Sequence, residues 1–475
     1  MSFLYGIIES KKTAFFLTAL FFSVGVALIF SVNGTGDEGD SILHYLYARH
    51  APVHPELFFH HWAKPLFVLS ASPFAHFGFS AIKFFNLSLS TATLWLTFLI
   101  ARKLKIKYAA LAVLFCMFSP MLLVLSLSGL TEPLFAFALG LCILLYLNEK
   151  IFAAVILVSF LPFVRSEGLI ICGVFGFVLL LEKRFFLLPF LLVGHLVYGI
   201  AGYSTHHSFL WTITQIPYAR LSSVYGKGTW EHFFVKTPFV TGYPLYGLLI
   251  AGVVVLLLRM FGKNYWKENL REIILIYGCF LSFFFAHVIF WALGIFNSFG
   301  LLRVLIGVLP LMAIIMLRGI SLLDFLRSER LKQWSLIPLL ALIIIFPFTK
   351  NNCAWHFDEQ FILSDGEKLI TQAVNFMEKN YPDYRNSVFY YDADYVSVLL
   401  DIDRFDKNVS RMVWENWSAQ HTKQEFVFWD DWFSQHETNI DLNTVVSNPR
   451  FEQLQEFTLT DRRGNHRRLV LFKSK

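Results

Sequence analysis

The chain has 475 residues, of which 56% are hydrophobic and 17% are aromatic, and its formal net charge at pH 7 is +6. This composition is unlike that of an ordinary soluble domain and is typical of a protein that crosses a membrane several times. The basic residues stand in short clusters between apolar runs, as in cytoplasmic loops, so nucleic acid is not needed to explain the positive charge. The five cysteines show no spacing typical of a metal site or a disulfide framework.

The first predicted membrane span covers residues 13–32 and follows Lys11 and Lys12. Short basic flanks stay in the cytoplasm, so the N-terminus is predicted to be cytoplasmic and the next residues to lie on the outer side of the membrane. A cleaved signal peptide is disfavoured, because the apolar stretch is long for one and no small-residue cleavage motif is evident before Asp37.

Ten further apolar runs bring the predicted number of transmembrane helices to about eleven. These runs cover residues 80–101, 109–127, 132–148, 151–164, 168–181, 185–203, 243–260, 272–293, 299–317 and 333–348. Alternation of sides places every large basic cluster in the cytoplasm, as expected for a multi-pass protein of a cell inner (plasma) membrane. The runs at 151–164 and 168–181 are short for spans, and a broken or re-entrant pair there would leave the later orientation unchanged.

The chain changes character after Phe348, where long apolar runs end. Residues 1–348 are therefore predicted to form a transmembrane module, and residues 349–475 a small extracytoplasmic α/β domain. Alternating patterns predict strands at 387–391, 426–429 and 468–472, and an amphipathic helix over 366–379.

Residues 33–79, called the first loop below, are predicted to lie on the outer side and are rich in His and aromatic residues. Residues 41–50 are predicted to form an amphipathic helix along the membrane interface. Further on stand His60, His61, Trp62 and Lys64. Adjacent histidines project differently, which favours packing or substrate contact over metal binding. The first loop is therefore a candidate for binding a lipid-linked substrate at the outer leaflet.

Asp37, Glu38 and Asp40 form an acidic cluster directly after the first span. One interpretation is a solvated loop in which Asp40 caps the following helix. The other is a carboxylate that removes a proton from an acceptor hydroxyl while a second one orients it or helps to hold a divalent cation. A short acidic motif is weak support for a metal, so no cofactor is assigned and a divalent cation stays open.

Four more ionisable residues stand where predicted spans meet the outer side: Glu132, Arg165, Glu167 and Arg303. Charged groups at span ends beside a cavity are candidates for a functional site. Each also has a structural interpretation: Glu132, before Pro133, as an acid at a helix start, Arg165 and Glu167 as an ion pair, and Arg303 as a side chain reaching the headgroups.

In order and predicted side, these motifs resemble the GT-C superfamily of polytopic glycosyltransferases, whose relatives include protein O-mannosyltransferases, aminoarabinose transferases of lipid A and dolichol-dependent mannosyltransferases. The matching segments are Asp37-Glu38, His61 to Leu66, Thr131 to Leu134, Arg165 to Gly168, and Arg303 followed by Leu309-Pro310. The resemblance covers about the first 350 residues, and the C-terminal domain fits the same layout. One departure is Val304, where the family often has an aromatic residue after the arginine.

The resemblance implies an inverting transfer of a hexose or pentose from a polyprenyl-phosphate donor to a hydroxyl of a glycan, lipid or protein acceptor at the outer face of the membrane. It implies that Asp37 or Glu38 is the general base, with Asp37 favoured, and that Arg303, Lys64 and Arg165 are the candidate cations for the phosphate. The other residues expected to contact substrate are Asp40, His60, His61, Trp62, Glu132 and Glu167. Two alternatives remain: a lipid or glycan transporter or flippase, and a non-enzymatic assembly or sensor protein.

Overall fold

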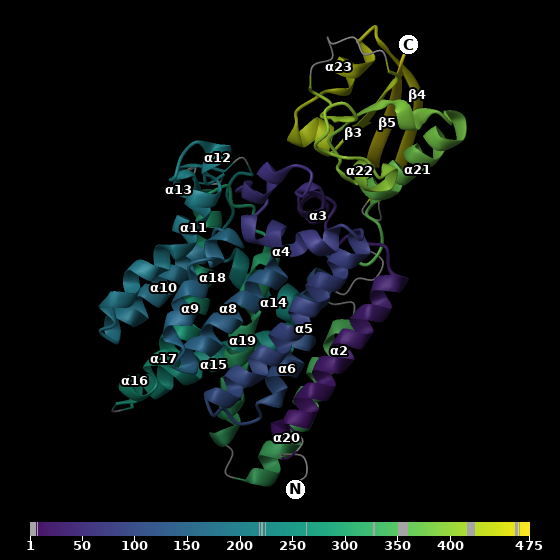
Figure 1. Ribbon diagram of the computed structural model, residues 1–475. Coiled ribbons are helices and arrows are strands. Elements are labelled where there is room, and N and C mark those ends of the chain that lie inside the picture. Colours follow the sequence, from purple (N-terminus) through teal and green to yellow (C-terminus); the bar gives the residue numbers. More distant parts are fainter. Residues whose placement is uncertain are drawn as a thin grey trace.

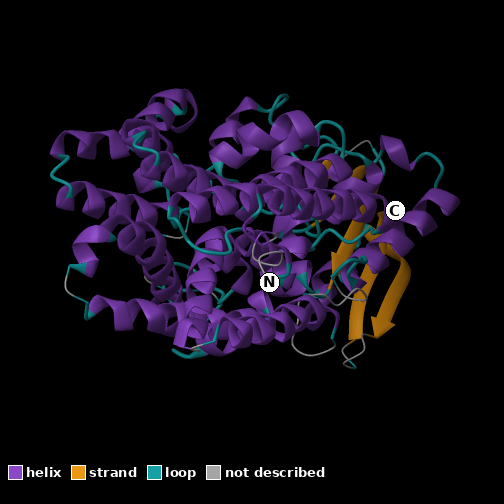
Figure 2. Ribbon diagram, turned by 90° about the horizontal axis from the view of Figure 1, so that it is seen from below, coloured by secondary structure: helices purple, strands orange, loops and turns teal. Residues whose placement is uncertain are grey.

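The computed structural model describes residues 6–475 except 7, 218, 220–221, 224, 263, 326–327, 350–359, 416–422, 461–463 and 465. A bundle of helices carries a smaller part with a β-sheet on one end (Figure 1). This end is called the upper end below, and the end at which the N-terminus lies is called the lower end. Figure 2 shows the strands gathered toward one side of the helices.

Most helices of the bundle match the apolar runs of the sequence. Its main elements are α2 (Lys11–Ser31), α3 (Asp40–His50), η1 (Pro55–Phe59), α4 (Pro65–Ala75), α5 (Phe79–Lys103), α6 (Ala110–Met117), α7 (Pro120–Ser126), α8 (Glu132–Leu147), α9 (Ile151–Val158), η2 (Leu161–Phe163), α10 (Gly168–Leu181), η3 (Phe185–Leu192), α11 (Val193–Ala201), α14 (His232–Thr241), α15 (Tyr243–Met260), α17 (Leu270–Glu272), η4 (Ile273–Gly278), α18 (Cys279–Leu293), η5 (Leu302–Val308), α19 (Leu309–Gly319), η6 (Ile320–Phe325), α20 (Glu329–Ile345) and η7 (Phe346–Phe348). The short helices α12 (Tyr203–His206), α13 (Trp211–Thr214) and α16 (Tyr265–Glu268) join them.

Within the described residues, five helical stretches are long and apolar enough to cross a membrane, and six shorter apolar helices accompany them. The long ones cover Lys11–Ser31, Phe79–Lys103, Tyr243–Met260, Leu270–Leu293 and Leu302–Leu323. The predicted run 109–127 is divided into α6 and α7 at Phe118 and Ser119, because Pro120 cannot continue a helix but fits its first turn. The chain is therefore a multi-pass helical membrane protein, as the composition predicts.

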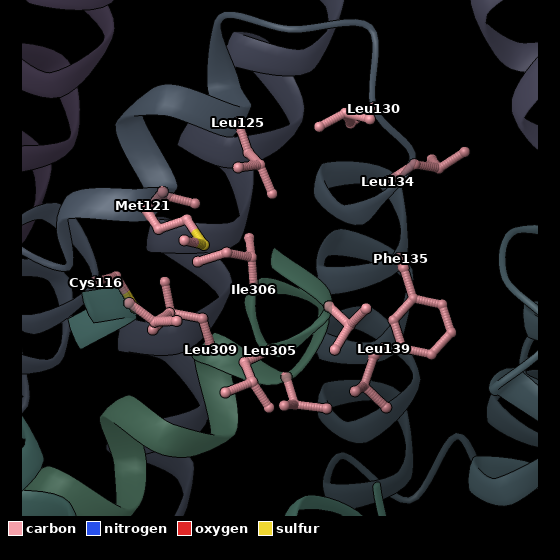
Figure 3. Close-up of a cluster of buried hydrophobic side chains, with 14 of the residues drawn as sticks. Cys116, Met121, Leu125, Leu130, Leu134, Phe135, Leu139, Leu305, Ile306 and Leu309 are labelled. Carbon is pink, nitrogen blue, oxygen red and sulfur yellow. The ribbon is translucent and has the colours of Figure 1, made fainter. Parts of the chain in front are cut away.

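The centre of the bundle is the stretch formed by η5 and α19, which packs against α8 and α15. Leu305 and Ile306 are fully buried and lie between α7 and α8 (Figure 3). A Cβ atom at Gly307 would come within 2.8 Å of Phe135 Cδ1, so the two elements are in close contact. This packing fixes the start of η5, where Arg303 stands, against the upper end of α8.

The C-terminal part is a five-stranded mixed sheet in the order β2-β1-β3-β5-β4. Its strands are β1 (Val388–Tyr391), β2 (Ser410–Arg411), β3 (Glu425–Asp430), β4 (Phe451–Thr460) and β5 (His466–Ser474), and its helices include α21 (Asp365–Asn380), α22 (Tyr395–Leu400) and α23 (Leu442–Val446). β1 pairs in parallel with β2 and β3, whereas β5 is antiparallel to β3 and β4. Three strands and α21 lie where the sequence predicts them.

Side chains of the central strands alternate between two cores, as the period of a strand requires. Phe426, Phe428 and Leu471 join the large core that includes α21, whereas Val427 and Trp429 belong to a separate core with Val445 of α23. A capping box at Ser364 and Glu367 begins α21.

Candidate functional site

The acidic cluster lies at the upper end, where α3 begins. Asp37 Oδ1 accepts hydrogen bonds from the backbone N of Gly39 at 3.0 Å and of Ser41 at 3.4 Å. The sequence offered Asp40 as the helix cap, and this is wrong: Gly39 is the cap residue, Asp40 is the first residue of α3, and the Asp40 carboxylate pairs with Arg303.

The turn between α7 and α8 is fixed closely against the first loop. Ser41 Oγ accepts a hydrogen bond from Gly129 N and donates one to Thr35 O, both at 2.7 Å. Gly129 is required here, since a Cβ atom would stand 2.2 Å from Ser41 O. Asn86 of α5 donates to the carbonyls of Ser128 and Leu130 from below. These contacts bring Glu132, at the start of α8, to the acidic cluster.

Arg303 of η5 joins three carboxylates from distant parts of the sequence. Its guanidinium forms ion pairs with Asp37 Oδ2 and Asp40 Oδ2, and its Nε lies 3.4 Å from Glu132 Oε1. The side chain of Glu132 is buried, whereas those of Asp37 and Asp40 are 30% and 42% exposed. Arg303 is thus turned inward to carboxylates instead of reaching the headgroups.

Arg165 forms the second centre of the same network. Its Nη1 lies 2.7 Å from Glu132 Oε1 and its Nη2 lies 2.7 Å from Glu167 Oε1. Arg165 and Glu167 stand in the irregular turn between η2 and α10, so a separation of two residues still allows them to meet. Burial raises the pKa of Glu167, but Arg165 and His287 outweigh this effect and hold it at about 2.

These six residues, Asp37, Asp40, Glu132, Arg165, Glu167 and Arg303, are called the carboxylate–arginine cluster below. Four carboxylates face two guanidinium groups, and Glu132 is shared by both arginines. Because a buried carboxylate is costly unless it is paired, the shared Glu132 ties η5 to the turn before α10. Its two exposed members, Asp37 and Asp40, are the ones that a ligand at the upper end would meet.

Lys64 stands next to this cluster, at the start of α4. The side chain is buried, and its Nζ donates a hydrogen bond to Ser166 Oγ at 3.1 Å. Burial and the nearby Arg165 lower the pKa of Lys64, while Glu167 and Asp40 raise it, and together these effects hold it at about 8. The backbone φ of Lys64 is 65°, a strained value for a lysine, and strain of this kind clusters at functional sites.

His60, His61 and Trp62 contact separate partners. His60 Nε2 lies 3.3 Å from Tyr47 Oη, and His61 Nε2 lies 3.2 Å from Thr212 O. Trp62 stacks on His44, with ring centroids 4.8 Å apart. The two adjacent histidines project differently, as the sequence indicates, and they pack beside the carboxylate–arginine cluster instead of joining it.

His44 was not among the candidate residues, although its spacing of four from Asp40 on α3 places both on one helix face. Burial, with Lys64, Arg303 and Arg165 nearby, lowers its pKa to about 3, so His44 is neutral near pH 7. Asp37 acts on this pKa in the opposite direction. Thr131 and Ser166 stand in the matching segments, but they were not among the candidate residues, and the folded chain shows that they contact Arg165 and Lys64. The sequence analysis did not single out His287, which lies 3.6 Å from Glu167.

Glu38 faces away from Asp37 and toward the C-terminal part. Ser364 Oγ donates a hydrogen bond to Glu38 Oε2 at 2.5 Å, and Arg467 Nη1 lies 3.7 Å from Glu38 Oε1. The cavity beside Glu38 has a volume of about 10 Å³, which is room for about one water. Glu38 therefore lies at the contact between the first loop and the C-terminal part.

Further contacts hold the first loop between the bundle and the C-terminal part. Thr35 Oγ1 donates to Glu367 Oε1 at 2.7 Å, and His54 Nε2 lies 2.8 Å from Asp403 Oδ2. Arg49 of α3 forms an ion pair with Asp401. In Figure 1, α3 accordingly lies directly beneath α22. The loop that carries Asp37 is thus fixed from both sides.

Metal binding has no clear donor set in the part of the chain that the structure describes. No three His, Cys, Asp or Glu side chains converge there as a metal site would require. The carboxylates of the carboxylate–arginine cluster face guanidinium groups instead.

The fold resembles that in the crystal structure of ArnT from Cupriavidus metallidurans bound to undecaprenyl phosphate, with a TM-score of 0.60. The match covers 96% of this chain and 97% of the other, at 11% sequence identity. No protein-family model and no curated protein matches the sequence. The chain therefore has an ArnT-like fold, which confirms the predicted helical membrane architecture with a C-terminal sheet.

Proposed function

We propose that this protein is a membrane glycosyltransferase that moves a sugar from a polyprenyl-phosphate donor to an acceptor hydroxyl. Two observations support it: the fold is that of a transferase whose crystal structure contains undecaprenyl phosphate, and the upper end of the bundle carries Arg303 and Lys64 beside two partly exposed carboxylates. The observation that carries the proposal is the ion pair between Arg303 and Asp37, since it holds a guanidinium suited to binding a phosphate beside a partly exposed carboxylate suited to accepting a proton.

The topology proposed with it puts the upper end on the outer side of the membrane. Residues 1–348 form the transmembrane module and residues 349–475 the extracytoplasmic domain, and the basic flanks at the lower end face the cytoplasm.

The proposed chemistry is an inverting displacement at the anomeric carbon. Asp37 accepts the proton of the acceptor hydroxyl while the oxygen of that hydroxyl bonds to the anomeric carbon. The bond from that carbon to the phosphate oxygen breaks, and its electron pair leaves with the polyprenyl phosphate. Arg303 and Lys64 offset the negative charge that develops on the leaving group.

The ion pair between Arg303 and Asp37 suits this chemistry because a phosphate can compete for it. When the donor phosphate takes the guanidinium, Asp37 Oδ2 loses its ion-pair partner and is free to accept a hydrogen bond from the acceptor hydroxyl. Asp40 is the second carboxylate near the reacting atoms, whereas Glu38 is engaged with Ser364. Asp37 is therefore the better candidate for the base.

The test is transfer of labelled sugar by purified protein from a panel of polyprenyl-phosphate sugars that includes mannose and aminoarabinose donors. Each donor is assayed with and without a chelator, which decides whether a divalent cation is needed. Turnover with at least one donor is expected. Tight donor binding without turnover, in the presence of varied acceptors, would contradict the proposal and favour a transporter or flippase.

A first prediction separates Asp37 from Glu38. Both Glu38→Gln and Ser364→Ala are expected to lower kcat by at most about tenfold, because each weakens one hydrogen bond that positions the loop. The KM for the donor stays unchanged. Asp365→Asn serves as control, because Asp365 is a partly exposed neighbour on α21 that pairs with Lys368 and not with Glu38.

If Glu38 were the base instead, Glu38→Gln would lower kcat by about 10²–10⁴-fold while Ser364→Ala kept its activity. Comparing the loss of kcat in Glu38→Gln with that in Ser364→Ala therefore decides whether Asp37 or Glu38 is the base.

A second prediction concerns pH and the buried Lys64, whose pKa is about 8. A charged Lys64 attracts phosphate and a neutral one does not, so donor affinity is expected to be full below pH 8 and to fall as pH rises above it. Lys64→Arg should remove this fall, because arginine stays charged throughout. Lys64→Gln should bind weakly at every pH. Wild-type affinity that is constant from pH 7 to about 9.5 would contradict the role of Lys64.

A further inference from the structure

The lower end of the bundle contains a cavity of about 180 Å³ lined by five basic residues. They come from separate elements: Lys105 and Lys107 from the turn after α5, Arg259 from the end of α15, Arg318 from α19, and Lys332 from α20. By the same measure a single water needs about 10–15 Å³, so this cavity has room for a small polar group.

Three of the basic residues around the cavity carry a positive charge that no ion pair with a described residue compensates. Arg318 forms a bidentate ion pair with Glu272, and Arg259 Nη2 donates to Ser321 Oγ at 3.2 Å. Lys105, Lys107 and Arg259 form no ion pair with any residue that the structure describes. None of the described residues that line the cavity is acidic. Like charges brought together in this way repel one another, and a bound anion would relieve the repulsion.

Membrane topology alone does not account for this arrangement. Basic residues are expected at a cytoplasmic end, but Arg102 and Lys103 meet that requirement from exposed positions that do not line the cavity. The cavity instead gathers cations from four segments around one space. The rest of its lining includes five aliphatic side chains, so one wall is apolar.

The position of the cavity relative to the membrane indicates which kind of anion it binds. Lys105 and Lys107 directly follow the apolar stretch Phe79–Lys103, and Arg259 stands near the end of the stretch Tyr243–Met260. The cavity therefore lies at the level of lipid headgroups, with cations for a phosphate and aliphatic side chains for the start of an acyl chain. We propose that it binds the phosphate headgroup of an anionic lipid in the leaflet at the lower end.

The test compares variants of the purified, delipidated full chain in mixed micelles titrated with phosphatidylglycerol, and counts bound lipid by native mass spectrometry. Lys105→Gln combined with Arg259→Gln is expected to weaken binding about fivefold for each cation removed. Arg102→Gln combined with Lys103→Gln removes the same charge from the same end and should leave binding unchanged. Phosphatidylcholine should bind wild type and variants equally weakly.

Two outcomes would overturn the proposal. Equal weakening by both pairs of substitutions would mean attraction to the charged surface and no site in the cavity. Displacement of phosphatidylglycerol by inorganic phosphate at equal concentration would mean that the cavity takes a free anion and gains nothing from the acyl chain. Should the double variant fail to fold, Lys105→Gln alone gives the same comparison, because Lys105 is exposed and its loss leaves the core intact.

Discussion

Asp37→Asn is expected to lower kcat for sugar transfer by about 10²–10⁴-fold, the usual contribution of a general base. The fold should survive, because asparagine caps a helix as well as aspartate does and can still accept from the backbone N of Gly39. Donor affinity should not fall, since the variant removes the carboxylate that competes with the phosphate for Arg303.

The measurement is kcat and donor KM for the purified variant beside wild type, together with its melting temperature. Glu56→Gln is the matched control, because Glu56 is an exposed acid of the same loop that does not contact the carboxylate–arginine cluster. Activity of Asp37→Asn within tenfold of the control would remove Asp37 as base. If Asp37→Asn also lowered the melting temperature strongly, the loss of activity would be attributed to a destabilised fold and not to the loss of a base.

Arg165→Met is expected to give the largest loss of stability. It leaves the buried Glu132 without the partner 2.7 Å away and leaves Glu167 without its nearest guanidinium. Breaking a buried ion pair by removing one partner costs about 3–5 kcal/mol, because the remaining charge stays buried. The added substitution Glu132→Gln should recover part of this loss, since it removes the stranded charge.

Thermal unfolding of the detergent-purified variants measures this effect. Arg49→Met is the control: its ion-pair partner Asp401 is 72% exposed, and exposed pairs contribute about 0–1 kcal/mol. The expected order of melting temperatures is wild type and Arg49→Met highest, the double variant next and Arg165→Met lowest. Equal melting temperatures for Arg49→Met and Arg165→Met would contradict the buried network.

The sequence predicts the helical architecture well, because a long apolar run in a bilayer satisfies all its backbone hydrogen bonds by forming a helix. It also locates most of the charged residues that meet at the upper end, since Asp37, Glu132, Arg165 and Arg303 each stand at the end of an apolar run. Their pairing could not be predicted, because residues from four distant segments come together through the packing of η5 against α8.

The contact of Glu38 and the strand β4 could not be predicted from the sequence, for different reasons. Glu38 and Asp37 are neighbours, and only the contact with Ser364, more than 300 residues away, turns Glu38 to the C-terminal part. The edge strand β4 was not predicted because its side chains are mostly exposed and polar, so it lacks the alternating pattern that reveals β1, β3 and β5.

The most direct test of the proposed function follows two labels on one donor. Purified protein in sealed liposomes receives a polyprenyl-phosphate sugar labelled on both the sugar and the phosphate, with an acceptor supplied outside. The proposal predicts that the sugar label moves to the acceptor while the phosphate label remains with the lipid. In the Asp37→Asn variant, the two labels are expected to stay together on the donor. Both labels staying together and crossing the bilayer would contradict a transferase and identify a flippase.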